Sequence, residues 1–517
     1  MKRSKYHNII FGRFALVAIL IIAQILLNSV FWHHLETYYF AFRTVTTVSE
    51  VLLLLFVINK HEPASYKLPW VLAILFFSFS GMLMYLLLGV PRHSRAVKRK
   101  FAAAEKNNEL YLNAGDKYLS PDGFSETSDE FAEISRYVYN ASKQPAYDDS
   151  LSVYIPSGEK FFDLLEEKLK NAEKYIFLEY FIIGEGEVWN AIHEILKEKV
   201  KQGVKVYLLY DDVGSIGKVP SRFDEKLRKE GISAYKFNPF VPVVSGVLNN
   251  RDHRKIAVID GEISFTGGIN ISDEYANITK PYGMWKDCGV MLEGEAADSF
   301  VLAFIGMYNL YARRRLFPED FLVKHPERAP GCRCGFVQPF CDGPKPFNDK
   351  NIAQNVYTQM IFAAKKYIYI TTPYLIVDYS MIESLCVCAE RGVDVRILTP
   401  HVPDKKSVFA MTRSAYMPLI KSGVKVYEYG EGFVHSKNVV FDDRVAITGT
   451  VNFDYRSFVH HYEDGVLLCD NEAVTDIRDD FLATVSACGI LQTEKTAKLK
   501  FIDKIVKSLI SIFAPLL

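Results

Sequence analysis

The sequence predicts an α/β protein with two duplicated α/β/α sandwich domains, preceded by transmembrane helices. Three observations lead to this prediction. Long uncharged stretches occur within the first 92 residues. Between about 150 and 490, apolar strand-like segments alternate with helical periods, and their order repeats once. A sparse motif, His-x-Lys followed five residues later by Asp, occurs at the same place in each repeat.

Bulk composition narrows the class of protein. A chain of 517 residues is long enough for two or three domains, each with its own core. Lysine plus arginine and aspartate plus glutamate both number 61, so net charge gives no argument for a nucleic-acid partner. The cysteine groups 332–341 and 386–388 lack C-x-x-C spacing, which favours reduced thiols in a cytosolic environment over a zinc site.

Residues 1–92 are expected to form a membrane anchor. Segments 14–32 and 70–90 carry no charge and are long enough to cross a bilayer. Segment 45–58 is apolar but shorter, and it is interpreted as a third span, a re-entrant piece or an interfacial helix. A cleaved signal peptide is the alternative for the first segment, but there is no small-x-small cleavage pattern and another span follows.

Basic residues flank this anchor on both sides. Because cytoplasmic flanks carry an excess of lysine and arginine, two spans would leave both flanks and the large C-terminal part in the cytoplasm. Three spans would put one basic flank on the wrong side. The residues are Lys2, Arg3, Lys5 and Arg13 before the first span, and Arg92, Arg95, Lys98, Arg99 and Lys100 after the last.

An internal repeat follows a polar linker, predicted over 93–149. Each half opens with an amphipathic helical stretch, near 161–175 and near 351–367. Near-continuous β-branched and aromatic strands alternating with helices indicate mostly buried sheets covered on both faces, in domains at 150–325 and 326–490. The expected strands are 176–183, 203–212 and 231–237 in the first half, and 368–377, 392–400 and 423–429 in the second.

The repeated motif follows the third strand of each half. Gly267 and Gly449 both lie 14 residues beyond their histidine, and Asn270 and Asn452 both lie 17 residues beyond it. A single match by chance has a probability on the order of a few per cent, but two matches with shared offsets in equivalent repeats do not arise by chance. The motif residues are His253, Lys255 and Asp260, and then His435, Lys437 and Asp442.

Strand geometry separates the roles within the motif. The histidine and the lysine of each half are two residues apart, so on a strand they project from the same face. Asp260 and Asp442 lie at odd separations, and Asp260-Gly261 is a hairpin-turn signal. The aspartates are therefore interpreted as mainly structural, with a direct part in catalysis as the alternative.

A reactive histidine also needs a partner that holds its tautomer. Later in each half, the phrases KDCGVML and YEDGVLL align Asp287 with Glu463. These carboxylates are candidates to orient His253 and His435. The alternative is that both are surface charges.

Each half carries only one histidine, one lysine and one asparagine of the expected site. The two domains are therefore expected to pack with their motif edges facing one another. Lysines and amides can hold the non-bridging oxygens of a phosphodiester, each donor contributing on the order of 3 kcal/mol. One imidazole can attack phosphorus while the other, protonated, supplies the leaving oxygen with a proton. This set predicts phosphoryl chemistry without a metal or another cofactor.

These residues and three longer phrases resemble the phospholipase D superfamily and, within it, bacterial cardiolipin synthases. The phrases are NNRDHRKIAVIDGEISFTGGINISDEY, YIYITTPYLIVD and GFVHSKNVVFDDRVAITGTVNFDYRSF, and the resemblance covers about 150–490. The apolar N-terminal spans and the chain ending APLL also resemble these enzymes. The resemblance implies a plasma-membrane enzyme that condenses two phosphatidylglycerol molecules into cardiolipin and glycerol through a phosphatidyl-histidine intermediate.

The resemblance also implies roles for the motif residues. His253 would be the nucleophile and His435 the general acid, then the general base, although the near-symmetric repeat leaves the reverse assignment open. Lys255, Lys437, Asn270 and Asn452 would bind the phosphoryl oxygens. One departure is the phrase VHHY at 459–462, where a Leu-Asn-Phe-like phrase is expected; it lies beside Glu463 and bears on the acceptor alcohol and the level of activity.

The tail at 491–517 is expected to contain an amphipathic helix. Apolar residues recur at helical spacing over 501–513, with lysines largely on the other side. Such a helix lies on anionic membrane lipid or docks its apolar face on the protein.

Three functional classes follow from these predictions. A lipid transferase leads; a phospholipid hydrolase or a nuclease would use the same histidines with water as acceptor, and the neutral charge does not favour the nuclease. A non-catalytic scaffold is the third class, and the intact His-Lys pairs argue against it.

Overall fold

The computed structural model describes residues 36–90, 95–112, 129–148, 150–240, 249–325, 335–345 and 350–498, together with residues 19, 22–26, 29, 30 and 348. The chain divides into two compact units. The smaller contains the apolar helices, and the larger comprises Arg95–Pro239 and Arg251–Asp503.

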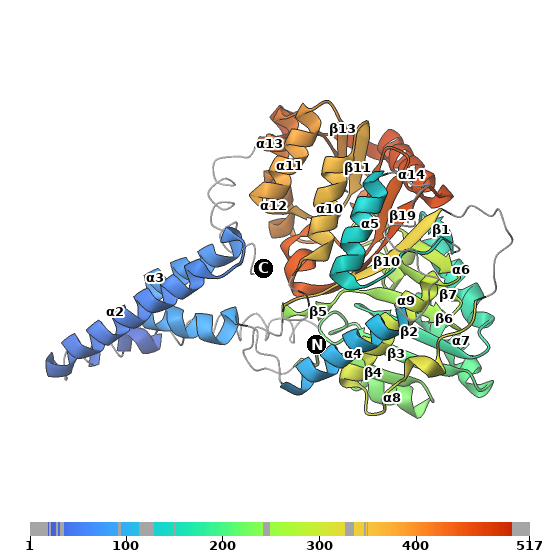
Figure 1. The fold of residues 1–517 in the computed structure, drawn as a ribbon, viewed down its shortest axis with the longest axis horizontal. Helices are drawn as coiled ribbons and strands as arrows, with labels where there is room; N and C mark the ends of the chain where they lie inside the picture. The colour runs from blue at the N-terminus through green and yellow to red at the C-terminus, as the bar shows by residue number, and fades with distance from the viewer. Residues whose placement is uncertain are drawn as a thin grey trace. The chain divides into compact units, whose positions relative to one another are not determined.

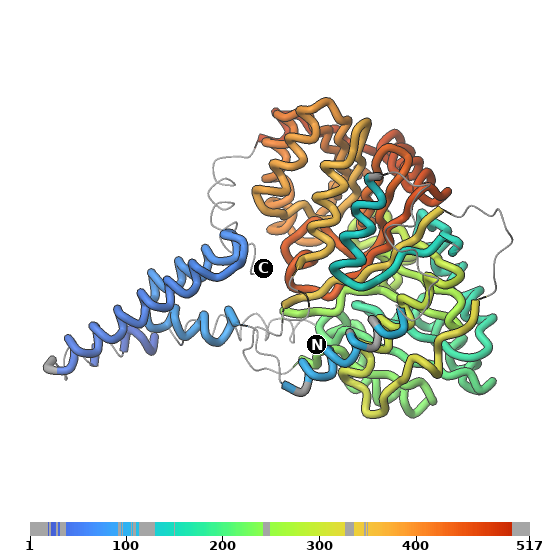
Figure 2. Tube along the Cα trace, in the orientation of Figure 1, coloured from blue at the N-terminus to red at the C-terminus, as the bar shows by residue number. Residues whose placement is uncertain are grey.

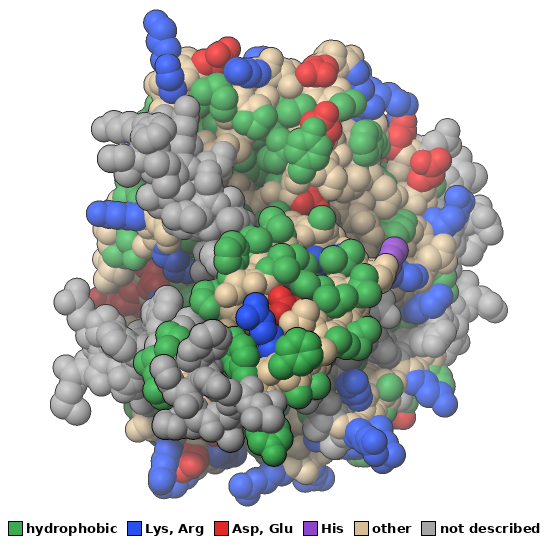
Figure 3. Space-filling model, turned by 90° about the vertical axis from the view of Figure 1, so that its left-hand side faces the viewer, with side chains coloured by type: hydrophobic (Ala, Val, Ile, Leu, Met, Phe, Trp, Pro, Cys, Tyr) green, Lys and Arg blue, Asp and Glu red, His purple; other side chains and the backbone are tan. Residues whose placement is uncertain are grey.

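The smaller unit contains two long apolar helices, α2 (Glu36–Asn59) and α3 (Ala64–Met84), the second continued by a π-helical turn to Gly89. By length and composition, Tyr38–Asn59 and Ala64–Gly89 can each cross a membrane. Many of their hydrophobic side chains are exposed, among them Leu52, Phe56 and Phe76, and Figure 3 shows hydrophobic side chains gathered on one face. Segment 45–58, which looked short in the sequence, belongs to a helix that begins at Glu36.

The first expected span, 14–32, lies mostly outside the described residues. Gln24 is described, and its side-chain oxygen accepts hydrogen bonds from the backbone nitrogen and the hydroxyl of Ser80 on α3, at 3.1 and 2.5 Å. Between apolar helices such a contact satisfies polar groups that lipid cannot. The tail is described only to residue 498, so the amphipathic helix expected over 501–513 also lies outside the described residues.

The larger unit contains two sheets with the same strand order (Figure 1). In the first sheet this order is β1 (Leu151–Ile155), β9 (Gly289–Glu293), β7 (Ile263–Gly267), β6 (Lys255–Ile259), β2 (Tyr175–Tyr180), β3 (Lys205–Asp211) and β4 (Ser233–Phe237). In the second it is β10 (Phe336–Asp342), β19 (His461–Cys469), β17 (Val445–Gly449), β16 (Asn438–Phe441), β11 (Tyr367–Thr371), β13 (Asp394–Pro400) and β14 (Lys425–Tyr429), with β20 (Gly489–Leu491) at the edge.

Pairing direction repeats as well. β2, β3 and β4 are parallel, and so are β11, β13 and β14, while the remaining strands of each sheet's shared order pair antiparallel. The expected strand 368–377 is divided into β11 and the short β12 (Leu375–Ile376), which pairs with β18 (Phe453–Asp454). Pro373 between them has no N–H to donate to a ladder. The predicted duplication is confirmed.

Helices cover both faces of each sheet, which confirms the α/β/α architecture. α6 shows the local cause: the hydroxyl of Ser157 caps its first turn, and Phe161, Leu165 and Leu169 form one buried stripe. On the first sheet lie α6 (Gly158–Lys170), α7 (Glu187–Lys201) and α8 (Phe223–Lys229), opposite α9 (Ala296–Tyr311). On the second lie α10 (Ile352–Ala363), α11 (Tyr379–Glu390) and α13 (Tyr416–Lys421), opposite α14 (Glu472–Cys488); α12 (Lys406–Ser414) and α15 (Glu494–Ala497) also belong to this half.

The segment predicted as a polar linker contains two helices that pack on the larger unit. α4 (Arg95–Leu112) lies against α9, and α5 (Asp129–Ser142) lies beside α10. Phe131, Ile134 and Val138 recur at helical spacing and are fully buried in the core of the second half. The polar composition of 93–149 hides this narrow apolar stripe. Figure 2 follows the chain from α5 into the first half and then into the second.

Candidate active site

Two short strands exchange between the halves and position the site. β5 (Arg251–Asp252), in the first half, pairs in parallel with the start of β19, in the second. β15 (Gly432–Val434), in the second half, pairs in parallel with β8 (Met284–Lys286), in the first. Each exchanged strand ends directly before a motif histidine. The expectation that the motif edges face one another is therefore met by backbone pairing.

This register carries each histidine to a carboxylate of the other half. The backbone N–H of His253 donates to the carbonyl of Tyr462 at 2.9 Å, and that of His435 donates to Lys286 at 2.7 Å. Nδ1 of His253 lies 2.9 and 3.0 Å from the oxygens of Glu463, and Nδ1 of His435 lies 2.7 Å from Asp287. Both carboxylates are fully buried, so neither is a surface charge.

These contacts define the reactive atoms. A carboxylate accepts, so the proton of each neutral ring lies on Nδ1 and the lone pair lies on Nε2. Nζ of Lys437 also lies 2.8 Å from Nδ1 of His435, but Nδ1 can serve only one of these partners. Asp287 is the stronger partner because it is anionic. The imidazole Nε2 atoms are therefore the groups available for chemistry.

The motif lysines are buried beside their histidines. Lys255 donates to the backbone carbonyl of His253, and Lys437 donates to that of His435. Burial lowers the pKa of Lys255 and lowers that of Lys437 to about 7. An anionic phosphate bound beside these amines would favour their charged ammonium form.

Burial also sets the charge state of the histidines. It lowers the pKa of His253 well below its usual range, and Lys255 and Lys437 lower it further. Burial and Lys437 lower the pKa of His435 to about 4, although Asp287 opposes this shift. Charges from both halves thus act on His253, as expected for one shared site.

The two asparagines differ in their contacts. The side-chain oxygen of Asn270 accepts from the backbone of Ile182 at 2.9 Å, and its nitrogen donates to the hydroxyl of Tyr275 at 2.7 Å. The nitrogen of Asn452 lies 3.3 Å from Asp454, and its buried oxygen has no hydrogen-bond partner among the described residues. Only the nitrogen of Asn452 can donate to a phosphoryl oxygen, and it carries a second N–H besides the one directed at Asp454.

The motif aspartates lie at the other end of the motif strands, away from the histidines. Asp260 accepts from the backbone nitrogens of residues 173–175 at 2.7–2.8 Å, and Asp442 accepts from residues 365–367 at 2.7–2.9 Å. Both have positive φ, 56° and 54°, as a turn requires. Their place fits the structural interpretation, and neither carboxylate contacts a motif histidine.

The shared glycines allow a close backbone approach. A Cβ on Gly267 would lie 2.4 Å from the carbonyl oxygen of Cys288, and one on Gly449 would lie 2.5 Å from that of Asp464. Each glycine therefore lets the strand that follows the motif pass against the backbone of the residue next to the orienting carboxylate, Cys288 after Asp287 and Asp464 after Glu463.

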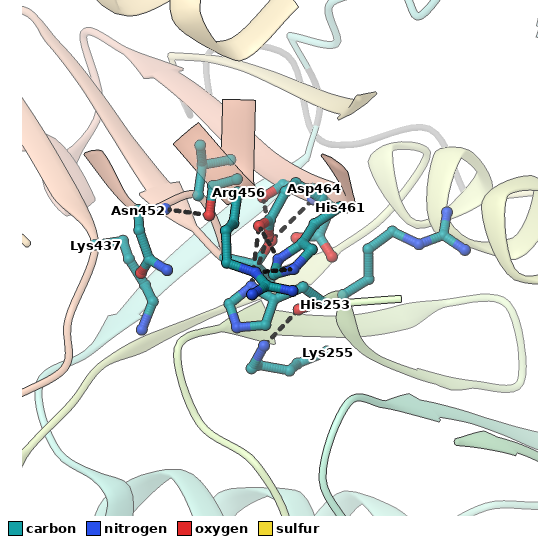
Figure 4. Close-up of polar contacts among 12 residues, drawn as sticks. His253, Lys255, Lys437, Asn452, Arg456, His461 and Asp464 are labelled. Atoms are coloured by element: carbon teal, nitrogen blue, oxygen red, sulfur yellow. Dashed lines mark hydrogen bonds and ion pairs between the residues drawn. The ribbon is translucent and has the colours of Figure 1, made fainter. Parts of the chain in front are cut away.

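Two site residues were not singled out as functional from the sequence: His461 and Arg456 (Figure 4). The His461 ring centre lies 5.3 Å from that of His253, and Nε of Arg456 donates to Nε2 of His461 at 3.2 Å. His461 stands two residues before Glu463 on β19, so the period of a strand places both on one face. That spacing, within the departing phrase VHHY, was the available signal.

A cavity of about 550 Å³ lies elsewhere in the larger unit. It is lined by Phe101 of α4, Met307 of α9, and Arg254 and Tyr462, but by neither motif histidine. Arg254 alternates with His253 and Lys255 along the chain, and its guanidinium binds the buried Glu179 instead. The reaction centre is therefore not this cavity.

Comparisons with known proteins agree with this geometry. A family described as "Cardiolipin synthase, PLD-like domain" matches residues 165–280 and 357–485, and one described as "Phospholipase_D-nuclease N-terminal" matches residues 51–89. The crystal structure of phosphatidylserine synthase from Haemophilus influenzae superposes with a TM-score of 0.55 at 16% identity, over 74% of this chain and 98% of that one. This likeness shows a common fold.

Two relatives match almost end to end. The chain is 35% identical over 463 residues to an uncharacterised protein of Streptococcus mutans, covering 90% of this chain and 99% of that one. It is 31% identical over 511 residues to a cardiolipin synthase of Geobacillus kaustophilus, covering 98% of this chain and 99% of the relative. Identity of this extent over nearly the full length of both proteins shows that the chain belongs to the cardiolipin synthase family, within the phospholipase D superfamily.

Proposed function

We propose that the protein transfers a phosphatidyl group between two phosphatidylglycerol molecules, giving cardiolipin and glycerol. The observation that carries this proposal is the crossed pair of buried contacts, His253 with Glu463 and His435 with Asp287, in a chain of this family. Two oriented imidazoles with opposite tasks are what a two-step phosphoryl transfer through an enzyme intermediate requires.

In the first step, Nε2 of His253 attacks phosphorus of the donor lipid. The bond between phosphorus and the glycerol oxygen breaks, and that oxygen takes a proton from Nε2 of His435, so glycerol leaves as a neutral alcohol. Lys255 and Lys437 bind the non-bridging oxygens as negative charge builds on them. Glu463 stabilises the positive charge that His253 acquires in the phosphatidyl adduct.

In the second step, His435 is a neutral base. It takes the proton of a glycerol hydroxyl on the second phosphatidylglycerol, and the hydroxyl oxygen attacks phosphorus. The bond between phosphorus and Nε2 of His253 breaks, cardiolipin leaves, and His435 holds the proton needed for the next donor. Asp287 stabilises this imidazolium, as a carboxylate does in other histidine-dependent transfers.

The surroundings of the two histidines support this assignment. The nucleophile must be neutral, and the pKa of His253 is held well below its usual range by burial and by Lys255 and Lys437. The acid must carry a proton, and Asp287 counteracts part of the downward shift of His435. Bound phosphate adds a negative charge that raises the pKa of the acid further.

We further propose that α2 and α3 cross the plasma membrane as a hairpin, with α2 in place of the segment 14–32 expected from the sequence, and that the larger unit lies in the cytoplasm. The basic residues that follow α3 support this orientation. Maleimide that cannot cross membranes, applied to intact cells, should label a Lys60→Cys variant in the turn between the helices. Labelling of this variant only after the cells are opened would contradict the proposed orientation.

Lipid analysis of the purified enzyme with labelled phosphatidylglycerol in mixed micelles tests the function. Cardiolipin and glycerol should form in equal amounts, and both His253→Ala and His435→Ala should abolish them. His193→Gln is the matched control, because His193 is a buried histidine of α7 bound to Glu230 at 2.6 Å and takes no part in the site. Phosphatidic acid as the only product would show that water is the acceptor and would refute the transferase.

A further inference from the structure

The position two residues before the orienting carboxylate differs between the halves. In the first half it is Trp285, whose ring centre lies 5.2 Å from that of His435. In the second half it is His461, whose ring centre lies 5.3 Å from that of His253. The duplicated scaffold thus places an aromatic ring against each motif histidine, but only His461 adds a second imidazole.

His461 completes a set of potential metal ligands. Nitrogen atoms of His253 and His461 and an oxygen of Glu463 all lie within 4.8 Å of one another, and all three residues are buried. Nδ1 of His253 is 2.9–3.0 Å from the Glu463 oxygens, and Nδ1 of His461 is 3.6 Å from one of them. Ligands at zinc distances in a tetrahedron are about 3.4 Å apart, so small shifts suffice.

A second observation also points to a ligand. His461 is only 8% exposed, and its Nδ1 has no hydrogen-bond partner among the described residues. A buried polar atom without a partner costs free energy unless something joins it. The neighbouring Nδ1 of His253 and the Glu463 carboxylate show which kind of ligand would satisfy all three groups.

We propose that a divalent transition-metal ion of the zinc type binds His253, His461 and Glu463 and inhibits the enzyme. Two imidazoles and one carboxylate form a known zinc ligand set with an open fourth position for water. In the proposed reaction His253 carries its proton on Nδ1 and attacks through Nε2. A metal on Nδ1 moves that proton to Nε2, which then has no lone pair for phosphorus, so no adduct forms.

Arg456 opposes this metal. Its Nε–H donates to Nε2 of His461 at 3.2 Å, a contact that needs the His461 proton on Nδ1. Metal at Nδ1 requires the proton on Nε2 and therefore breaks the Arg456 contact, and the guanidinium charge also repels the ion. The two residues thus have opposite predicted effects: removing His461 weakens metal binding, and removing the Arg456 charge strengthens it.

Direct metal binding tests the inference without any lipid. The full-length enzyme in an uncharged detergent, treated with chelator and then freed of it, is titrated with Co²⁺ and then with Zn²⁺. One equivalent of Co²⁺ should produce the visible bands of a tetrahedral site, and Zn²⁺ should displace it. His461→Asn should weaken zinc binding at least about tenfold, Arg456→Met should strengthen it, and His193→Gln should leave it unchanged.

Absence of saturable binding, or equal affinity in His461→Asn and the parent, would overturn the inference. The inference rests on the proposed function only for its inhibitory consequence. In the cardiolipin assay, zinc should inhibit the parent at lower concentration than it inhibits His461→Asn. Cardiolipin synthesis without metal binding would refute the metal site alone, and metal binding without cardiolipin synthesis would refute the proposed function alone.

Discussion

The two halves of the larger unit share a scaffold and differ around the reacting atoms. Both contain the same strand order, a motif aspartate that accepts from three backbone nitrogens, and a glycine against the backbone next to the orienting carboxylate. His435, however, lies among Trp285, Tyr275 and Phe433, whereas His253 lies beside His461 and Phe181. Duplication therefore supplies the frame, and the surrounding side chains divide the chemical tasks.

The orienting carboxylates differ in the same way. Asp287 lies against Gly268, where an added Cβ would come within 2.0 Å of its oxygen. Glu463 instead accepts a hydrogen bond from the hydroxyl of Thr450, the residue equivalent to Gly268. The shorter carboxylate approaches backbone, and the longer one is held by a neighbouring side chain. The two contacts serve the same purpose through different local packing.

The largest effect should come from the histidines. His253→Ala and His435→Ala should each reduce cardiolipin formation by at least about 10³-fold, because either loss stops a covalent step. Single-turnover measurements with labelled phosphatidylglycerol check this prediction. Substantial turnover in either variant would show that one half can act alone and would contradict a shared site.

Next come the carboxylates. Glu463→Gln and Asp287→Asn should each lower kcat by about 10²- to 10⁴-fold, because an amide no longer holds the proton on Nδ1. Each change should couple to the histidine of the other half. A double-mutant cycle with His253→Ala should show little further loss for Glu463→Gln, but independent loss would contradict the crossed pairing.

The dependence of kcat/KM on pH tests the role of Lys437. The pKa of Lys437 is lowered to about 7 by burial, so the ammonium loses its charge as pH rises through that value. Since the charged form binds the phosphoryl oxygens, kcat/KM should fall above about pH 7, measured with phosphatidylglycerol diluted in uncharged detergent. Lys437→Arg should be slower but keep its charge, and its profile should stay level across this range.

Lys199→Arg is the control for that profile. Lys199 is a buried lysine of α7 that donates to the carbonyl of Ala172 at 3.0 Å, outside the site. Its substitution should leave the pH dependence as in the parent. The same falling limb in Lys437→Arg would assign the titration to another group.

The smallest effect on the chemistry should come from the motif aspartates. Asp260→Asn or Asp442→Asn weakens three backbone contacts at a turn, which should cost about 2 kcal/mol of stability and lower Tm by several degrees. The residual folded enzyme should keep its kcat within about twofold of the parent. A large loss of kcat with an unchanged Tm would instead support a direct catalytic role for these aspartates.

Much of this architecture could be predicted from the sequence. The repeat and the motif pairs were found because identical spacings recur in equivalent places, and Asp287 and Glu463 were paired because each precedes a shared Gly-Val-x-Leu phrase. The exchange of carboxylates was not predicted, because alignment within each half cannot reveal that β5 and β15 pair with strands of the other half. Helix α5 was missed because its apolar stripe is narrow within a polar segment.

The central claim is one shared site in which His253 forms the phosphatidyl adduct. The most direct measurement is mass spectrometry of the His435→Ala variant, denatured at mildly alkaline pH after incubation with phosphatidylglycerol because a phosphorus–nitrogen bond hydrolyses in acid. The account predicts a phosphatidyl group on the peptide that contains His253. The group forms slowly because this variant lacks the acid of the first step, and it is retained because the variant also lacks the base that activates the second lipid. An adduct on His435 in the His253→Ala variant, with none on His253 in His435→Ala, would contradict the assignment.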